Sequence, residues 1–433
     1  MFLLKIMCRK QKRWLFFGWI CLFLLMIVFF RSQEQGSICE NLTRTDEQNR
    51  VAVDFQTSAV GKILKERRRN LLQFCANTEL LKAGNSSEKI IRGHFVYDLK
   101  HKFVYCAAEK AGSTFWRRLY QIISGVSNKK SPFDIHSDSA LGGDQKTFRP
   151  ISFDFIHALL QESVKFVIAR DPFSRLFSGF ANKLFEVNPS FWSTVGRMVI
   201  RYARTNASKE SLSFGHDVRF PELIKYVIMS ERSGSYRDGH FIPISDHCRP
   251  CQIKYDIVAK METLKEDTMF VLQQLNMTHV DELVKAIENL DEVSELDSIK
   301  ITSKHTLQRL IPSLPVSKAE GLRRTWRSFQ YRGYIGKHIK YPLSKEEEET
   351  IDNEGLTQLF QNAVKSSGSR KSRLANRHLV LQEAYSQIPL EDLLALSDIF
   401  KTDCGAFGYD CKPDYIFKPT EKVQTNFLDI WNA

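Results

Sequence analysis

Two stretches of the sequence place a short apolar strand directly before a polar loop and an amphipathic helix. Residues 102–106 (KFVYC) are rich in β-branched and aromatic side chains, and after a loop of small residues the apolar positions of 115–123 recur with helical spacing. Residues 164–169 (VKFVIA) lead in the same way into 170–175 and a helical apolar stripe. Two strand–loop–helix units predict an α/β fold with a central parallel sheet flanked by helices.

The first loop, residues 108–114 (AEKAGST), has the composition of an anion-binding loop. A strand that ends in small residues and opens a helix leaves backbone N–H groups facing a common centre, where the helix dipole favours negative charge. Gly112 permits close approach, Lys110 supplies a full charge, and Ser113 and Thr114 supply hydroxyl donors. The lysine precedes the glycine, so this is not the loop of nucleoside triphosphatases. An ordinary helix start after a strand has the same composition, and the loop alone leaves both interpretations open.

The second loop, within residues 170–178 (RDPFSRLFS), begins where the second strand ends. Arg170 can bind a phosphate group through two parallel hydrogen bonds, which a lysine cannot do. Ser178, two helical turns later, is placed to donate a hydroxyl to the same group. The alternative is a structural ion pair between Arg170 and Asp171 at the end of the strand.

The N-terminal region predicts a membrane anchor. Residues 14–30 (WLFFGWICLFLLMIVFF) are uncharged and apolar, at the short end of the roughly 20 residues that a spanning helix needs. The residues before this run include no acidic side chain and five basic ones: Lys5, Arg9, Lys10, Lys12 and Arg13. Positive flanks stay in the cytosol, so we expect a cytoplasmic tail at 1–13, a signal-anchor transmembrane helix at 14–30 and a lumenal body. A cleaved signal peptide is the alternative, although no small-residue cleavage site follows closely.

Glycosylation sequons and cysteines agree with a lumenal body. Four asparagines start the N-x-[ST] triplet that accepts N-linked glycans: Asn41, Asn85, Asn206 and Asn276. Seven cysteines follow the apolar run, and in an oxidising lumen they tend to pair. Seven is an odd number, so at least one stays free or pairs with another chain, and a homodimer is one candidate assembly.

The sequence also suggests how the lumenal part is organised. Residues 31–93 are polar and read as a stem, and 94–433 as the catalytic domain. Residues 94–99 predict a strand that pairs with the next one through a tight turn. Residues 318–378 look like an insertion, and its end, 365–373 (KSSGSRKSR), predicts a flexible basic loop.

Residues 106–119 (CAAEKAGSTFWRRL), together with 170–178, resemble the motifs of the Golgi carbohydrate sulfotransferases. The similarity is greatest to the branch that contains the HNK-1 and chondroitin/dermatan 4-O-sulfotransferases. Further family-like blocks follow in the same order: 240–243 (HFIP), 248–251 (CRPC), 255–256 (YD), 260–263 (KMET) and 400–409 (FKTDCGAFGY). The resemblance implies a P-loop-like sulfotransferase fold, with 3′-phosphoadenosine 5′-phosphosulfate as the sulfate donor and no metal.

The resemblance also implies which residues bind the donor. Lys110, Gly112, Ser113 and Thr114 would hold the 5′-phosphosulfate, while Arg170 and Ser178 would hold the 3′-phosphate. With neighbouring positions the predicted donor site comprises Glu109, Lys110, Ala111, Gly112, Ser113, Thr114, Phe115, Arg170, Arg175 and Ser178. The chain departs from the family at Glu109, Ser113 and Phe115, where proline, cysteine and asparagine are usual, and at Phe241 and Ala259. A carboxylate beside an anionic donor is acceptable only if Glu109 points away.

The predicted chemistry is an in-line sulfuryl transfer, stabilised mainly by positioning and by cationic donors. Lys110 is the expected partner for the charge that builds on the leaving oxygen. A base must take the proton of the acceptor hydroxyl, and the candidates are His240, His157 and His136. We favour His240 because it lies in a family-like block.

The C-x-x-C pair at Cys248 and Cys251 has two interpretations. The first interpretation is half of a structural zinc site, but such a site takes about four ligands and the sequence has no second C-x-x-C. A short-range disulfide between the two cysteines is therefore preferred. Cys404 and Cys411 form a second candidate pair.

A formal net charge of +12 indicates an anionic partner. Nucleic acid is disfavoured because the basic body would be lumenal, so we expect a glycan acceptor, preferably an acidic one such as chondroitin. The predicted protein is a single-pass type II enzyme of the Golgi membrane. Two alternatives stay open: a lumenal kinase-like enzyme, for which no convincing magnesium-binding carboxylates are found, and a non-enzymatic glycan-binding membrane protein.

Overall fold

The computed structural model describes residues 53–56, 58–78, 92–140, 145–419 and 423–431. The predicted anchor at 14–30, Cys39 and the sequons at Asn41 and Asn85 lie outside these residues. Across the described part of the chain, no helix combines the length and the apolar character that crossing a membrane requires. Asn206 and Asn276 are both exposed, each in a left-handed backbone conformation that suits a turn.

The described part of the chain contains one four-stranded sheet with the order β1-β2-β3-β4. The strands are β1 (Phe95–Asp98), β2 (Phe103–Cys106), β3 (Val164–Ala169) and β4 (Ile257–Lys260). Strand β1 pairs antiparallel with β2, whereas β2, β3 and β4 run parallel. The predicted hairpin and the predicted parallel sheet of an α/β fold are therefore both confirmed.

Alternating strand residues face two separate cores, because successive side chains of a strand point to opposite faces of the sheet. Phe103 and Tyr105 pack with α4 (Ser113–Ile123) and α13 (Leu264–Gln274) on one face. Val104 and Cys106 pack with α5 (Phe153–Glu162) on the other face. Since both faces are covered, the strands are mostly apolar, which favours their recognition in the sequence.

Helices follow the parallel strands at a single edge of the sheet. The loop after β2 opens α4, the loop after β3 opens α6 (Pro172–Phe180), and η7 (Met261–Thr263) leads from β4 into α13. The carboxyl ends of parallel strands meet at one edge, and ligands of α/β proteins bind there. This topology brings the two predicted anion loops together.

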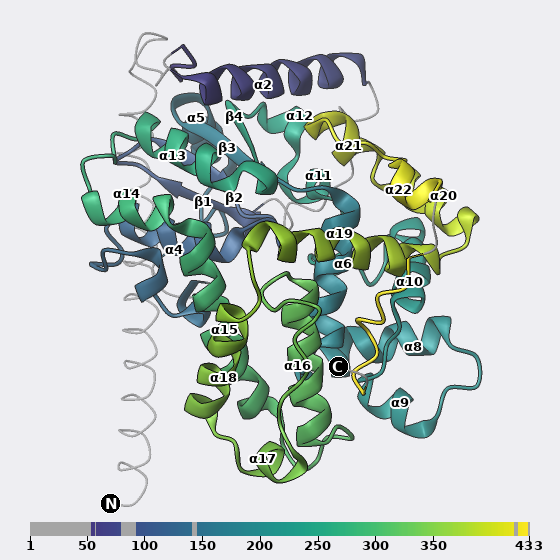
Figure 1. Cartoon of the computed structure of the whole chain (residues 1–433). Coiled ribbons are helices and arrows are strands. Elements are labelled where there is room, and N and C mark those ends of the chain that lie inside the picture. Colours follow the sequence, from purple (N-terminus) through teal and green to yellow (C-terminus); the bar gives the residue numbers. More distant parts are fainter. Residues whose placement is uncertain (1–52, 57, 79–91, 141–144, 420–422, 432–433) are drawn as a thin grey trace, which may run out of the picture.

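Most of the remaining chain is helical (Figure 1). Between β3 and β4 lie η5 (Ala181–Phe185), α7 (Pro189–Phe191), η6 (Trp192–Gly196), α8 (Arg197–Ala203), α9 (Lys209–Phe214), α10 (Phe220–Ser233), α11 (Ile244–Cys248) and α12 (Pro250–Ile253). After α13 come α14 (Asp281–Glu288), α15 (Leu290–Arg309), α16 (Lys318–Tyr331), α17 (Lys345–Thr350), α18 (Asn353–Lys365), α19 (Arg370–Ser386), α20 (Leu390–Ile399), α21 (Lys401–Phe407) and α22 (Asp414–Phe417). The short 3₁₀ turns η3 (Pro132–Asp134) and η4 (Ser137–Ala140) precede α5.

The helix α2 (Ala59–Asn77), which sequence analysis placed in a stem, packs against the sheet domain (Figure 1). Leu64 and Leu71 on its inner face are fully buried. Arg67 pairs with the buried Asp267 of α13 at 2.7 Å. These contacts make α2 part of the folded body.

Three disulfide bonds link the described cysteines, and they correct one prediction. Cys75 joins Cys251 and Cys106 joins Cys248, so the expected short-range bond between Cys248 and Cys251 does not form. Arg249, between the two cysteines, has a left-handed backbone conformation and separates α11 from α12. Cys248 thus meets the end of β2, while Cys251 meets α2. The predicted bond between Cys404 and Cys411 is present.

Removing the Cys75–Cys251 bond is expected to lower the free energy of unfolding more than removing the Cys404–Cys411 bond. The sequence separations are 176 and 7 residues. Chain-entropy arguments give about 5 kcal/mol for the long loop and about 2 kcal/mol for the short one. Guanidinium unfolding of the two double cysteine-to-alanine variants measures the difference, and equal losses would contradict the loop-length argument.

The segment 318–378 is largely helical, and its basic end is not the flexible loop that composition predicts. Helix α19 begins at Arg370, capped by the Ser369 hydroxyl. Arg373 is buried, donates to the Tyr334 carbonyl at 2.8 Å and pairs with Glu295. Long-range partners that composition does not reveal therefore order these basic residues.

Candidate functional site

The loop between β2 and α4 has an unusual backbone. Lys110 (φ 64°) and Gly112 (φ 74°) both adopt the left-handed conformation. A side chain at Gly112 would also come within 3.0 Å of the Met261 sulfur, so this position favours glycine. Gly112 caps α4 without a side-chain hydrogen bond, and the first turn holds no acidic residue. This helix start is thus free of a competing carboxylate and suits an anion.

The two predicted loops are in direct contact. The Arg170 guanidinium donates to the Lys110 carbonyl at 2.9 Å. Asp171 is the N-cap of α6, accepting from the Ser174 amide at 2.7 Å, so the carboxylate has a helix-capping role. Burial, ahead of the nearby cation Arg377, lowers the pKa of Arg170 to about 10. Ser178 lies half-buried on α6.

Arg175, predicted to contact the donor, instead spans backbone carbonyls. It is 1% exposed and donates to the carbonyl of Glu109 at 2.8 Å and to those of Gly239 and Ile242. These bonds tie the first loop to the segment before α11. We therefore assign Arg175 to positioning the loop rather than to donor contact.

Lys110 lies in a cluster of cations. Its ammonium donates to the Asn182 side-chain oxygen at 2.9 Å. Burial lowers the pKa of Lys110 well below its ordinary value, and Lys183, Arg332 and Arg170 lower it further, while Glu186 opposes them. Crowded cations are costly unless an anion shares the site. The arrangement is therefore suited to a phosphate or sulfate group.

His240 faces the same region. Its Nδ1 lies 2.8 Å from Asp238 Oδ1, and the Asp238 carboxylate also accepts from the His240 amide. Since a carboxylate accepts only, Nδ1 carries the proton and Nε2 of the neutral ring carries the lone pair. Burial lowers the pKa of His240, and the Asp238 hydrogen bond opposes this only in part. A neutral imidazole with a fixed tautomer is competent as a general base.

The other two histidines considered as bases lie in different surroundings. His157 is exposed on α5. His136 is also exposed and lies 3.5 Å from Asp138.

The ring of Phe191 packs edge-on against His240, and Lys183 lies over the same phenyl ring at 4.6 Å. Phe191 therefore brings His240 and Lys183 together.

The irregular residue of the first loop, Glu109, points toward two histidines. Its carboxylate oxygens lie 3.4 Å from His94 Nδ1 and 3.6 Å from His247 Nε2. These three side chains are close enough to surround a cation. Both nitrogens of the fully buried His247 are already used, however, by His94 at 2.9 Å and by the Gly239 carbonyl at 2.8 Å. The Arg175 guanidinium lies 3.5 Å from His247, and its positive charge also disfavours a metal ion. We therefore interpret these three side chains as a polar cluster with a structural role.

Sequence reasoning missed several side chains of this site: His94, Asn182, Lys183, Glu186, Asp238 and His247. One signal was available, because Asn182 follows Ser178 by four residues and lies on the same helical face. Two partners of Glu186, Ser328 and Arg332, come from far along the chain and carry no local signal.

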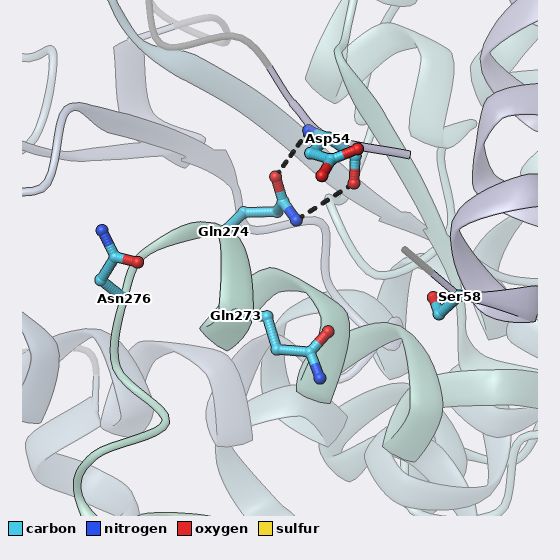
Figure 2. Close-up of a pocket in the computed structure, with 5 residues that line it drawn as sticks. All are labelled: Asp54, Ser58, Gln273, Gln274 and Asn276. Carbon is cyan, nitrogen blue, oxygen red and sulfur yellow. Dashed lines mark hydrogen bonds between the residues drawn. The ribbon is translucent and has the colours of Figure 1, made fainter. Parts of the chain in front are cut away.

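The shallow pocket of Figure 2 is not part of this site. It is lined by Asp54, Ser58, Gln273, Gln274 and Asn276. The Gln274 amide is bonded to the Asp54 backbone there. The lining holds no cation, so the pocket does not suit an anionic donor.

Comparison with known proteins agrees with the geometry. A model of the sulfotransferase family matches residues 93–314. Carbohydrate sulfotransferase 11 of Mus musculus is 33% identical over 222 residues, which cover 50% of this chain and 63% of that protein. Carbohydrate sulfotransferase 9 of Homo sapiens is 33% identical over 213 residues, covering 49% and 47%. Carbohydrate sulfotransferase 8 of Homo sapiens is 31% identical over 224 residues, covering 51% of each. The chain thus spans less than two thirds of each relative, and no solved structure matches it.

Proposed function

Because this chain belongs to the sulfotransferase family, we propose that it transfers a sulfuryl group from 3′-phosphoadenosine 5′-phosphosulfate to a glycan hydroxyl. One observation carries the proposal: the β2–α4 loop and the β3–α6 loop meet, with Arg170 bonded to the Lys110 carbonyl beside an uncapped helix start. Two cationic loops at one sheet edge suit a ligand with two separate anionic groups. The matched relatives are named carbohydrate sulfotransferases, which supports a glycan acceptor.

Donor binding is assigned as follows. Lys110, Gly112, Ser113 and Thr114 hold the 5′-phosphosulfate, with Ala111 and Phe115 shaping the loop. Arg170 and Ser178 hold the 3′-phosphate. Glu109 is turned toward His94 and His247, which answers the objection that a carboxylate in this loop repels the donor.

His240 and Lys110 divide the chemistry. His240 Nε2 takes the proton of the acceptor hydroxyl as its oxygen bonds to sulfur. The bond from sulfur to the bridging phosphate oxygen breaks, and the Lys110 ammonium stabilises the charge on that oxygen. Asp238 holds the His240 ring and stabilises its protonated form. This chemistry requires no metal ion.

The proposal includes the cellular location of the enzyme and the class of its acceptor. We place the enzyme in the Golgi membrane, with a single anchor at 14–30, a type II orientation and the sheet domain in the lumen. The disulfides of the described residues suit that oxidising compartment. The surplus of basic residues favours an acidic glycan acceptor. We also propose that the chain belongs to the branch that contains the HNK-1 and chondroitin/dermatan 4-O-sulfotransferases. Its proposed assembly is a homodimer.

The pH profile of the transfer rate is expected to have an acidic limb and an alkaline limb. On the acidic side His240 must be neutral, and its lowered pKa extends activity below the pH at which an ordinary histidine would be protonated. On the alkaline side Lys110 must be charged, and its lowered pKa brings the loss of activity below the ordinary lysine range. A pH profile of kcat measures both limbs. An alkaline limb at the position of an ordinary lysine would contradict the role given to Lys110.

Calorimetric titration of the full-length chain in detergent tests donor binding. We expect saturable binding of 3′-phosphoadenosine 5′-phosphate, the desulfated donor, that is weakened in Lys110→Ala and unchanged in Lys100→Ala, a change at an exposed turn residue. Binding of an acidic glycan with no binding of the nucleotide would instead support a non-enzymatic glycan-binding protein.

A further inference from the structure

We propose that Glu186 is a positioning residue for Lys110 and that α16, which lies beyond the family match at 93–314, holds Glu186 in place. The role in transfer rests on the proposed function, whereas the contact itself does not. Glu186 ends the π-helical turn η5 directly after α6, with its amide bonded to the Ala181 carbonyl. Such turns inside helices are frequent at functional sites.

A continuous chain of hydrogen bonds joins α16 to the donor loop. The Ser328 hydroxyl of α16 donates to Glu186 Oε1. Glu186 Oε2 accepts from Asn182 Nδ2 at 2.9 Å. Asn182 Oδ1 in turn accepts from the Lys110 ammonium at 2.9 Å.

The chemistry of these groups fixes the orientation of Asn182. An ammonium only donates and a carboxylate only accepts, so the amide must turn its oxygen to Lys110 and its nitrogen to Glu186. If Glu186 were uncharged and poorly held, this preference would weaken, and the amide could present its nitrogen to Lys110. Glu186 thus sets the position of the ammonium without touching it.

Glu186 is a buried carboxylate. It is 5% exposed and Ser328 is fully buried. A buried carboxylate is costly unless it is paired and hydrogen-bonded. Arg332, one turn after Ser328 on the same face of the chain, lies 3.8 Å from Glu186. The segment that supplies both partners therefore makes this carboxylate tolerable.

Other contacts from the same part of the chain hold the turn that carries Glu186. Arg324 of α16 donates to the Phe185 carbonyl at 3.2 Å and to the His216 carbonyl at 2.9 Å. Arg309 at the end of α15 donates to the Val187 carbonyl at 3.2 Å. The carbonyls on either side of Glu186 are thus fixed from α15 and α16.

The charge of Glu186 acts on Lys110 as well. The groups that face Lys110 are the cations Lys183 on η5, Arg332 after α16 and Arg170 after β3, and Glu186 is the anion that opposes them. Removing this negative charge lowers the pKa of Lys110 further. A larger neutral fraction of Lys110 leaves less positive charge for the leaving oxygen.

Two variants and one matched control test the inference in the full-length chain. Glu186→Gln keeps the shape of the side chain and removes its charge. Ser328→Ala removes the α16 hydroxyl alone. Thr325→Val is the control, because it removes another buried hydroxyl of α16 that bonds to Gly321 and Thr306 and not to Glu186.

The first measurement needs no enzymatic activity. Competitive acetylation of lysines across a pH series, read by mass spectrometry, gives the titration midpoint of Lys110. We expect this midpoint to fall in Glu186→Gln, to fall less in Ser328→Ala and to match the wild type in Thr325→Val. A midpoint in Glu186→Gln equal to that of the wild type overturns the inference, and so does an equal fall in Thr325→Val.

The second measurement links the contact to transfer. In Glu186→Gln we expect kcat to fall roughly tenfold and the alkaline limb of the pH profile to move to lower pH, with a smaller change in donor KM. Loss of stability without these changes overturns the positioning role. A wild-type chain that shows the Lys110 titration but transfers no sulfuryl group refutes the proposed function and leaves the contact confirmed, so the two failures are distinguishable. If thermal unfolding shows that Glu186→Gln folds poorly, the Lys110 titration midpoint and the kcat of Ser328→Ala test the inference instead.

Discussion

Replacement of Lys110 with alanine is expected to lower kcat for sulfuryl transfer by about a hundredfold to a thousandfold, the usual cost of removing one donor that stabilises developing charge. The ammonium lies at the meeting point of the two cationic loops, held by Asn182. Single-turnover kinetics with saturating donor isolate the chemical step.

Lys110→Arg separates charge from geometry. The arginine keeps the charge, but its planar head does not fit the position that Asn182 and the left-handed backbone of residue 110 define. We expect it to recover little activity. An unchanged kcat in Lys110→Ala, or full activity in Lys110→Arg, would show that residue 110 does not act as a placed point charge.

Replacement of His240 with alanine is the second large effect, with an expected loss in kcat of roughly a hundredfold to ten-thousandfold. The ring is held by Asp238 at 2.8 Å with Nε2 free to accept a proton. Without it, the acceptor hydroxyl must lose its proton to water. The acidic limb of the pH profile is expected to disappear together with the activity.

Two histidines provide matched controls for this prediction. His157→Ala and His136→Ala each remove an exposed imidazole and are expected to keep wild-type kcat. Asp238→Asn keeps His240 but weakens its orientation, so an intermediate loss is expected. A strong loss in His157→Ala with normal activity in His240→Ala would assign the base to α5 instead.

Strands β1, β2 and β3 were predictable because they are short and buried, whereas β4 was not predicted. Strand β3 buries all six of its residues, and all but Lys165 are apolar, which is typical of a strand covered on both faces. The meeting of the two predicted loops was predictable for the same reason. Each follows directly from a strand, so the small and charged residues of 108–114 and the arginine at 170 fall at one sheet edge.

Features that depend on distant partners were not predictable. Cys248 and Cys251 lie close in sequence, which favours a local bond, but the left-handed residue Arg249 directs them to β2 and α2. Nothing near Glu186 in the sequence distinguishes it from an ordinary residue at a helix end. Its hydrogen-bond partner Ser328 lies 142 residues further along the chain. Arg373 belongs to a basic run that composition assigns to solvent, yet Glu295 and the Tyr334 carbonyl bury it.

Glu109 shows how the structure resolved a conflict within the sequence. A carboxylate in an anion loop opposes donor binding, and spacing alone gave no direction for its side chain. His94 comes from the start of the sheet region and His247 from α11, and together they turn the carboxylate toward themselves. The conflict disappears because the neighbours of Glu109 are histidines brought together by the fold.

Transfer of radiolabelled sulfate from 3′-phosphoadenosine 5′-phosphosulfate to a panel of glycans by the full-length chain tests the central claim most directly. The panel includes chondroitin, dermatan and neutral glycoprotein glycans, with Lys110→Ala as the negative control. We predict label on at least one glycan, with acidic glycans preferred, and none with Lys110→Ala. Absence of label from every glycan, with no binding of the donor, would contradict the proposal that this chain is a carbohydrate sulfotransferase.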